Sequence, residues 1–172
     1  MGKILDAEER AQEYLAYYDK ILSWIAERVK EIPEEQRPRV YHSVNEVART
    51  DVKGSITDEM VKIAGIRNVI DEESSDIKLD GEKAFTTVEQ IYKWDPDLIL
   101  VNEPDAYRYF MEQDVFSGLR AVREQSVRQL PVGISRWGHP GSIETPIAAL
   151  YIAKTVYPSL FEDVDMEKET KE

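Results

Sequence analysis

Hydrophobic residues recur at every third or fourth position along residues 4 to 32. They are Ile4, Ala7, Ala11, Leu15, Tyr18, Leu22, Ile25, Val29 and Ile32. This spacing places them on one face of a helix, and Pro33 ends the pattern. At about 1.5 Å of rise per residue the helix would be roughly 40 Å long, which is long for a small domain. Such a rod either packs along the whole body of the protein or bridges to a second body.

Beyond Pro33, short apolar or β-rich runs alternate with helical patterns. We expect strands at 39–44, 66–70, 98–101 and 127–134, helices at 57–65, 87–94, 105–112 and 144–156, and partly helical structure over 115–122. A capping box at Thr87 and Gln90 opens one helix. Residues 45–54 are expected to form a loop, and residues 71–83 a polar surface excursion. The alternation predicts an α/β fold: a three-layer αβα lobe with a mostly parallel sheet, preceded by the long helix.

Ligands of such sheets bind beyond the carboxyl ends of the strands. Three predicted loops lie there, and they carry Asn45, Glu46 and Arg49; Asn102, Glu103 and Tyr107; and Arg136, Trp137 and His139. If the three strands are parallel, these side chains converge on one edge of the sheet. The segment RWGHPGSIETP, residues 136–146, is the most conspicuous, because glycines and prolines there surround a cation, an indole and an imidazole.

Composition excludes several classes of partner and cofactor. The net charge of −12 argues against nucleic acid and against an anionic membrane surface as partners. No cysteine is present, and the two histidines form no H-E-x-x-H motif, so neither a thiolate site nor a catalytic zinc is expected. Dinucleotide and P-loop glycine motifs are absent too. We expect no cofactor.

Several of these residues also have a purely structural interpretation. His42 lies inside a strand pattern and is expected to be a structural histidine whose ring is satisfied by a neighbour. Trp94 precedes Asp-Pro at a helix end and is expected to pack in the core. His139 and Trp137 fit a ligand contact and a packed loop equally well, and the two arginines fit solvated surface charges.

One long segment resembles a known family. TTVEQIYKWDPDLILVNE, residues 86–103, is similar to a pattern in the C-terminal lobe of ABC-transporter substrate-binding proteins for iron-siderophores, haem, cobalamin or certain oxyanions, the TroA-like class. RPRVYHSVNE resembles the first strand of that lobe, MVKIAGIRNVID a later segment, and ETPIAALYIAKTVYPSLF the last helix. The helix at 4–32 resembles the rigid helix that joins the two lobes of this class.

The resemblance covers roughly residues 4 to 163 and implies only half of such a protein. It implies an interlobe helix (1–33), a C-terminal α/β lobe (34–163) and a charged tail (164–172). We expect the N-terminal lobe, the signal peptide and the lipid anchor to lie outside this chain. The isolated lobe would then associate weakly with itself through the surface that faces the missing lobe.

The family implies binding without catalysis, in an extracytoplasmic protein that is periplasmic or membrane-anchored. The ligand lies between two lobes that move by a modest hinge. The lobes dock on a permease through carboxylates, for which Glu103 and Glu112 are the candidates here. The candidate ligand-binding residues are Asn45, Arg49, Tyr107, Arg136, Trp137 and His139.

The cationic candidates suit an anion, and the aromatic candidates suit a bulky organic chelate. The predicted ligand is therefore a metal chelate or an oxyanion. The alternatives are a stand-alone flavodoxin-like nucleotide-binding module, an enzyme subunit, and a scaffold that uses the long helix.

Overall fold

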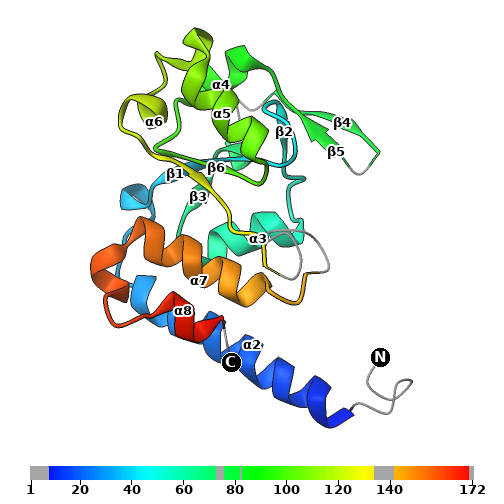
Figure 1. Ribbon diagram of the computed structural model, residues 1–172, viewed down its shortest axis with the longest axis vertical. Helices are drawn as coiled ribbons and strands as arrows, with labels where there is room; N and C mark the ends of the chain where they lie inside the picture. Colours follow the sequence, from blue (N-terminus) through cyan, green and yellow to red (C-terminus); the bar gives the residue numbers. More distant parts are fainter. Residues whose placement is uncertain (1–7, 73–75, 82, 134–141, 171–172) are drawn as a thin grey trace.

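The computed structural model describes residues 8–72, 76–81, 83–133 and 142–170 (Figure 1). Its α-helices are α2 (Glu8–Val29), α3 (Ile56–Ile63), α4 (Val88–Trp94), α5 (Pro104–Glu112), α6 (Arg120–Arg123), α7 (Thr145–Val156) and α8 (Met166–Glu169). Its strands are β1 (Arg39–Ser43), β2 (Arg49–Thr50), β3 (Arg67–Asn68), β4 (Lys78–Asp80), β5 (Lys83–Phe85), β6 (Leu98–Val101) and β7 (Val127–Gln129). Short 3₁₀ turns lie at Glu34–Gln36, Val69–Asp71, Asp114–Phe116 and Pro158–Phe161.

The central sheet is parallel, as the sequence predicts. Its strand order is β3-β1-β6-β7, and each neighbouring pair runs in the same direction. β6 is buried along its whole length, which explains why its sequence is a continuous apolar run rather than an alternating one. The predicted strand at 127–134 is shorter than expected, because β7 ends at Gln129.

Helices cover both faces of this sheet, which confirms the three-layer α/β lobe. On one face, residues of α3 and α7 pack with Val40 and Leu100. On the other face, residues of α4, α5 and α6 pack with Tyr41 and Ile99. The alternation of Val40 and Tyr41 between the two cores follows from the period of two along a strand.

A second, antiparallel sheet was not predicted. Its strand order is β2-β5-β4. The expectation of a plain loop at 45–54 is therefore wrong at β2, which places Arg49 in a strand. Within the described part of the predicted surface excursion, β4 pairs antiparallel with β5, although its side chains are exposed as expected. Strands of two or three residues are too short to show a hydrophobic period.

The long helix α2 lies outside the three layers, against α7 (Figure 1). Ile21, Ile25 and Val29 are its buried residues, and all three come from its carboxyl-terminal half. Leu15 in the other half is 58% exposed. The buried contacts of the helix are therefore concentrated in its carboxyl-terminal half. None of the described helices is both long and apolar enough to cross a membrane.

Gly65 lets the end of α3 approach the end of α2. It has a φ of +76°, and a Cβ on it would lie 2.9 Å from the Cβ of Val29. The backbone there needs a left-handed conformation and the neighbouring helix leaves no room for a side chain. The prediction that Gly65 closes the helix is confirmed in this way.

The Asp-Pro-Asp segment has a structural role at the amino end of the sheet. Asp95 adopts a left-handed conformation that ends α4, and its Oδ1 accepts a hydrogen bond of 2.8 Å from the backbone N of Arg120. Asp97 Oδ2 accepts one of 2.7 Å from the backbone N of Arg39. The two carboxylates thus fix the start of β1 and the start of α6.

Candidate functional site

The carboxyl ends of β1, β6 and β7 lie in one row. Ser43 is level with Val101, and Val101 is level with Gln129. The three strands are therefore parallel, and this is the condition under which we expect the three following loops to converge. The helices α5 and α7 follow β6 and β7 of this sheet, so their amino ends face this edge and favour negative charge there.

Hydrogen bonds fix the backbone of the loop after β1. The Tyr41 hydroxyl donates to the carbonyl oxygen of Val47 at 2.6 Å, and the Ser43 hydroxyl donates to that of Glu46 at 3.0 Å. The backbone N–H of Val44 donates to the carbonyl oxygen of Arg49 at 2.8 Å. Asn45 and Glu46 are consequently presented to solvent from a fixed backbone.

Arg49 lies beside this loop in β2, opposite Phe85 of β5. It is half-buried, and no carboxylate among the described residues forms an ion pair with it. In a chain with 34 acidic and 22 basic residues, a half-buried arginine that has no carboxylate partner in the described ranges is a candidate contact for an external anion.

The residues after β6 separate into two groups. Asn102 is buried at the carboxyl edge, and Glu103 follows it as the N-cap residue of α5. Tyr107 is half-buried and packs against the core beneath α5. Glu112 is exposed in the last turn of α5, so its Cα is about 13 Å from that of Glu103 along the helix. Glu103 and Glu112 therefore do not form one acidic cluster.

The predicted loop after the third strand is only partly described. Arg136, Trp137 and His139 lie outside the described residues, and their roles stay predictions. Ser142, just before α7, is buried and accepts a hydrogen bond of 3.1 Å from the backbone N of Glu144. The Thr145 hydroxyl donates to the carbonyl oxygen of Ser142 at 2.8 Å.

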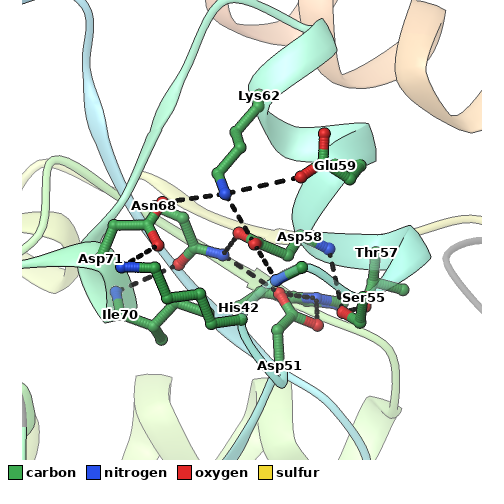
Figure 2. Close-up of polar contacts among 12 residues, drawn as sticks. His42, Asp51, Ser55, Thr57, Asp58, Glu59, Lys62, Asn68, Ile70 and Asp71 are labelled. Carbon is green, nitrogen blue, oxygen red and sulfur yellow. Dashed lines mark hydrogen bonds and ion pairs between the residues drawn. The ribbon is translucent and has the colours of Figure 1, made fainter.

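Beneath the carboxyl edge lies a buried polar network centred on His42 (Figure 2). The His42 side chain is completely buried, and its Nδ1 is 3.0 and 3.1 Å from the two oxygens of the Asp51 carboxylate. Its Nε2 is 2.9 Å from Asn102 Oδ1. The expectation that His42 is satisfied by its neighbours is confirmed, and it has a partner at each ring nitrogen.

The network continues from Asp51 towards the surface. Asn68 Nδ2 donates to Asp51 Oδ2 at 3.3 Å and to Asp58 Oδ1 at 2.9 Å. Lys62 Nζ lies 2.7 Å from Asp58 Oδ2 and 3.0 Å from Asp71 Oδ2. Lys62 and Asp71 line a surface hollow of about 340 Å³ beside β3. The chain of polar contacts thus joins the interior below the carboxyl edge to solvent.

The contacts of the network shift the pKa values of His42 and Asp71, each towards the charged form of the side chain. Burial alone would lower the pKa of His42, but attraction to Asp51 and the hydrogen bonds to Asp51 and Asn102 outweigh it and raise that pKa above 6.5. Burial would raise the pKa of Asp71, but its contacts with Lys62 and Lys53 lower it. Both shifts favour the charged forms of the side chains.

These groups do not form a metal centre in the described part of the chain. No three His, Asp or Glu side chains there are grouped so that they could hold a metal ion. The described edge offers the Arg49 cation, the exposed amide of Asn45, the largely buried amide of Asn102 and helix amino ends, and such groups can bind an anion.

Sequence reasoning missed Asp51, Asn68 and Asp58 as parts of the site. Asp51 and Asp58 come from a segment that was expected to be an ordinary loop and helix start. The only available signal was a histidine in the middle of an apolar strand, which requires a buried acceptor somewhere in the fold.

Comparison with known proteins agrees with this architecture. Residues 1–132 match the model of the family described as periplasmic binding protein. The molybdate-binding protein MolA of Haemophilus influenzae is 28% identical over 146 residues, which are 84% of this chain and 40% of that protein.

Solved structures show the same fold. An ABC transporter solute-binding protein from Sulfurospirillum deleyianum is 26% identical with a TM-score of 0.82, over 99% of this chain and 52% of that one. The structure of MolA bound to molybdate is 22% identical with a TM-score of 0.82, over 97% of this chain and 50% of that one.

The chain spans about half the length of these solved relatives. Half of such a protein corresponds to one lobe. The parallel sheet and the long helix beside it are the elements expected of the C-terminal lobe that the sequence resembles. The chain therefore belongs to the periplasmic binding protein family, the binding proteins of ABC transporters, and covers one lobe of such a protein.

Proposed function

We propose that this chain is part of the solute-binding component of an ABC importer, and that its ligand is an oxyanion of the molybdate type. The observation that carries the ligand class is Arg49, a half-buried cation beside the carboxyl edge without a carboxylate partner among the described residues. The similarity to the molybdate-binding protein MolA supports the same class. The protein would act outside the cytoplasm, as periplasmic binding proteins do.

In this proposal the carboxyl edge forms one wall of the binding cleft. Arg49 and the amides of Asn45 and Asn102 contribute polar contacts from the described residues, and Arg136, Trp137 and His139 contribute from the loop before α7. A second lobe supplies the other wall, and α2 connects the two. The amino-terminal half of α2 supports this connection, because none of its described residues is buried and only partly buried side chains such as Tyr14 and Tyr17 contact this lobe.

Docking on the permease is proposed for Glu103 rather than Glu112. Glu103 stands at the start of α5, on the edge that would face the permease together with the cleft, whereas Glu112 lies at the other end of that helix. In a transport assay with reconstituted permease, Glu103→Gln is expected to reduce uptake about tenfold or more while leaving ligand affinity unchanged. Glu112→Gln serves as the matched control with normal uptake.

The ligand is tested by calorimetry on the full-length protein with molybdate, tungstate, sulfate and a ferric siderophore. We expect molybdate and tungstate to bind, and Arg49→Ala and Arg136→Ala each to weaken binding at least about tenfold, or about 1.4 kcal/mol. Arg123→Ala removes an exposed arginine on α6, away from the edge, and should bind normally. Binding of the siderophore alone would refute the oxyanion assignment and favour the metal-chelate class, for which Trp137→Ala is then the informative variant.

A further inference from the structure

The side-chain amide of Asn102 has a protein partner at its oxygen, and none among the described residues at its nitrogen. Its side chain is only 4% exposed, and its Oδ1 faces the ring of His42 at 2.9 Å. Among the described residues, none accepts a hydrogen bond from its Nδ2. This nitrogen is not one of the fully buried side-chain atoms that lack a partner, so it keeps contact with solvent and can donate to a bound anion. It lies at the carboxyl edge, directly after β6.

The orientation of this amide is tied to the protonation of His42. Asp51 can only accept a hydrogen bond, so His42 Nδ1 carries a proton. If Nε2 also carries a proton, it must donate to an oxygen, and Asn102 Oδ1 faces it. If Nε2 loses that proton, it becomes an acceptor, and the amide must rotate by about 180° to offer its NH₂ group.

We propose that His42, as an imidazolium, is a positioning residue that holds the Asn102 amide with its NH₂ group free to donate to an anion bound at the carboxyl edge. This inference rests on the oxyanion function proposed above. Loss of the Nε2 proton would turn the Asn102 oxygen towards the ligand instead. An acceptor would then face the anion, and affinity would fall.

The surrounding charges support a protonated His42. Asp51 contacts the ring directly, and Asp58 is joined to it through Asn68. Lys62 of α3 balances Asp58, and Lys53 together with Lys62 balances Asp71. His42 is then the cation that balances Asp51, so deprotonation would leave a buried carboxylate without a counter-charge.

The cations of α7 and α2, which pack on the same face of the sheet as α3, have partners other than Asp51. The Lys154 ammonium of α7 donates to the carbonyl oxygens of Phe161 and Val164, at 2.9 Å each. Arg28 of α2 pairs with Asp163. Neither cation competes with His42 for Asp51. The geometry and the raised pKa of His42 therefore agree.

The first test needs no ligand. The 172-residue chain is labelled with ¹⁵N-histidine, and the two histidines are assigned by comparison with His139→Gln. Near pH 6.5, where an ordinary histidine is half protonated, we expect both ring nitrogens of His42 to carry protons. An unprotonated Nε2 at this pH would refute the positioning role, whatever the protein binds.

The second test follows molybdate affinity with pH in the full-length protein, over a range in which molybdate stays a dianion. Affinity should fall as His42 loses its proton in the first test. His42→Gln places an amide NH₂ near the position of Nε2, so it should keep affinity within about threefold and remove this pH dependence. Asn102→Asp keeps an acceptor for His42 but lacks the donor, and should bind at least about tenfold more weakly while remaining folded.

The outcomes separate the two proposals. Absence of molybdate binding at any pH, with His42 protonated, would refute the proposed function. Molybdate binding that is equally tight in wild type and Asn102→Asp would refute the positioning of Asn102 and leave the function intact. If His42→Gln fails to fold, the nitrogen resonances and Asn102→Asp still decide the question.

Discussion

The two halves of α2 should respond very differently to the same loss of side chain. Ile25 is fully buried in the core beside α3 and α7, whereas Leu15, on the same helical face by sequence, is 58% exposed. Truncation of a buried isoleucine to alanine removes its burial and leaves a cavity, at a cost of about 2–5 kcal/mol. We therefore expect Ile25→Ala to destabilise the 172-residue chain by about 3 kcal/mol.

Leu15→Ala should be nearly neutral in this chain. Little burial is lost, and alanine has a slightly higher helix propensity than leucine, so the change should stay within about 0.5 kcal/mol. In the full-length protein a second lobe is proposed to cover this half of the helix. The same substitution should then cost about 1–2 kcal/mol, the value of a leucine that is buried on assembly.

Urea denaturation of both variants, in the chain and in the full-length protein, measures the four changes. The slope of unfolding free energy against urea should stay the same for each variant and its parent, so that midpoints report stability. Equal losses for Leu15→Ala and Ile25→Ala in the chain would mean that the whole helix packs on this lobe. A neutral Leu15→Ala in the full-length protein would refute the interlobe role of α2.

Three further substitutions test local features of the fold. Asp51→Asn should cost about 3 kcal/mol near neutral pH, because it removes the counter-charge of buried His42. It should also reverse the pH dependence of stability, measured as urea midpoints. In wild type the raised pKa of His42 means that its contribution is complete below about 6.5 and is lost as pH rises through the folded pKa. In the variant, burial would lower that pKa, so stability should be lost as pH falls below about 6.5; an unchanged slope would contradict the pairing. Gly65→Ala should destabilise the protein by about 1–2 kcal/mol more than Gly54→Ala, because both residues have a φ of +76° but only a side chain at Gly65 would contact Val29. Equal melting temperatures of the two variants would show that α2 moves to make room for the new side chain. Tyr41→Phe removes the hydrogen bond to Val47, and we expect a loss of about 1 kcal/mol in thermal unfolding together with weaker molybdate binding; a loss of stability without a change in binding would exclude the loop after β1 from the site.

The parts of the fold that the sequence predicted are those with strong local signals. Thr87 accepts a hydrogen bond from the backbone N of Gln90 at the start of α4, as the capping box implies. The apolar run at 98–101 is the buried strand β6. Trp94 is 1% exposed in the core, as expected of a packing residue. In each case the local pattern and the tertiary environment favour the same conformation, which is why local reasoning was sufficient.

The parts that could not be predicted depend on contacts between distant segments. β2 consists of Arg49 and Thr50, and it is a strand only because β5 pairs with it from more than thirty residues away. The buried partners of His42 are 9 and 60 residues away in sequence. A histidine within an apolar run indicates that acceptors exist, but the acceptors among the many acidic and amide side chains are selected only when the strands assemble. The candidate site residues were chosen because they follow predicted parallel strands. The order of strands and helices along the sequence indicates that topology, although it does not identify buried partners.

One end of α2 extends beyond the carboxyl edge of the sheet. The Tyr14 hydroxyl donates to the carbonyl oxygen of Ile143 at 2.8 Å, just before α7 begins. The helix therefore passes the level of this edge near Tyr14, and its described residues from Glu8 to Glu13 extend beyond it towards the amino end (Figure 1). At about 1.5 Å per residue, that extension is roughly 9 Å long. In the proposed two-lobe protein, this stretch of α2 leads away from the carboxyl edge towards the second lobe.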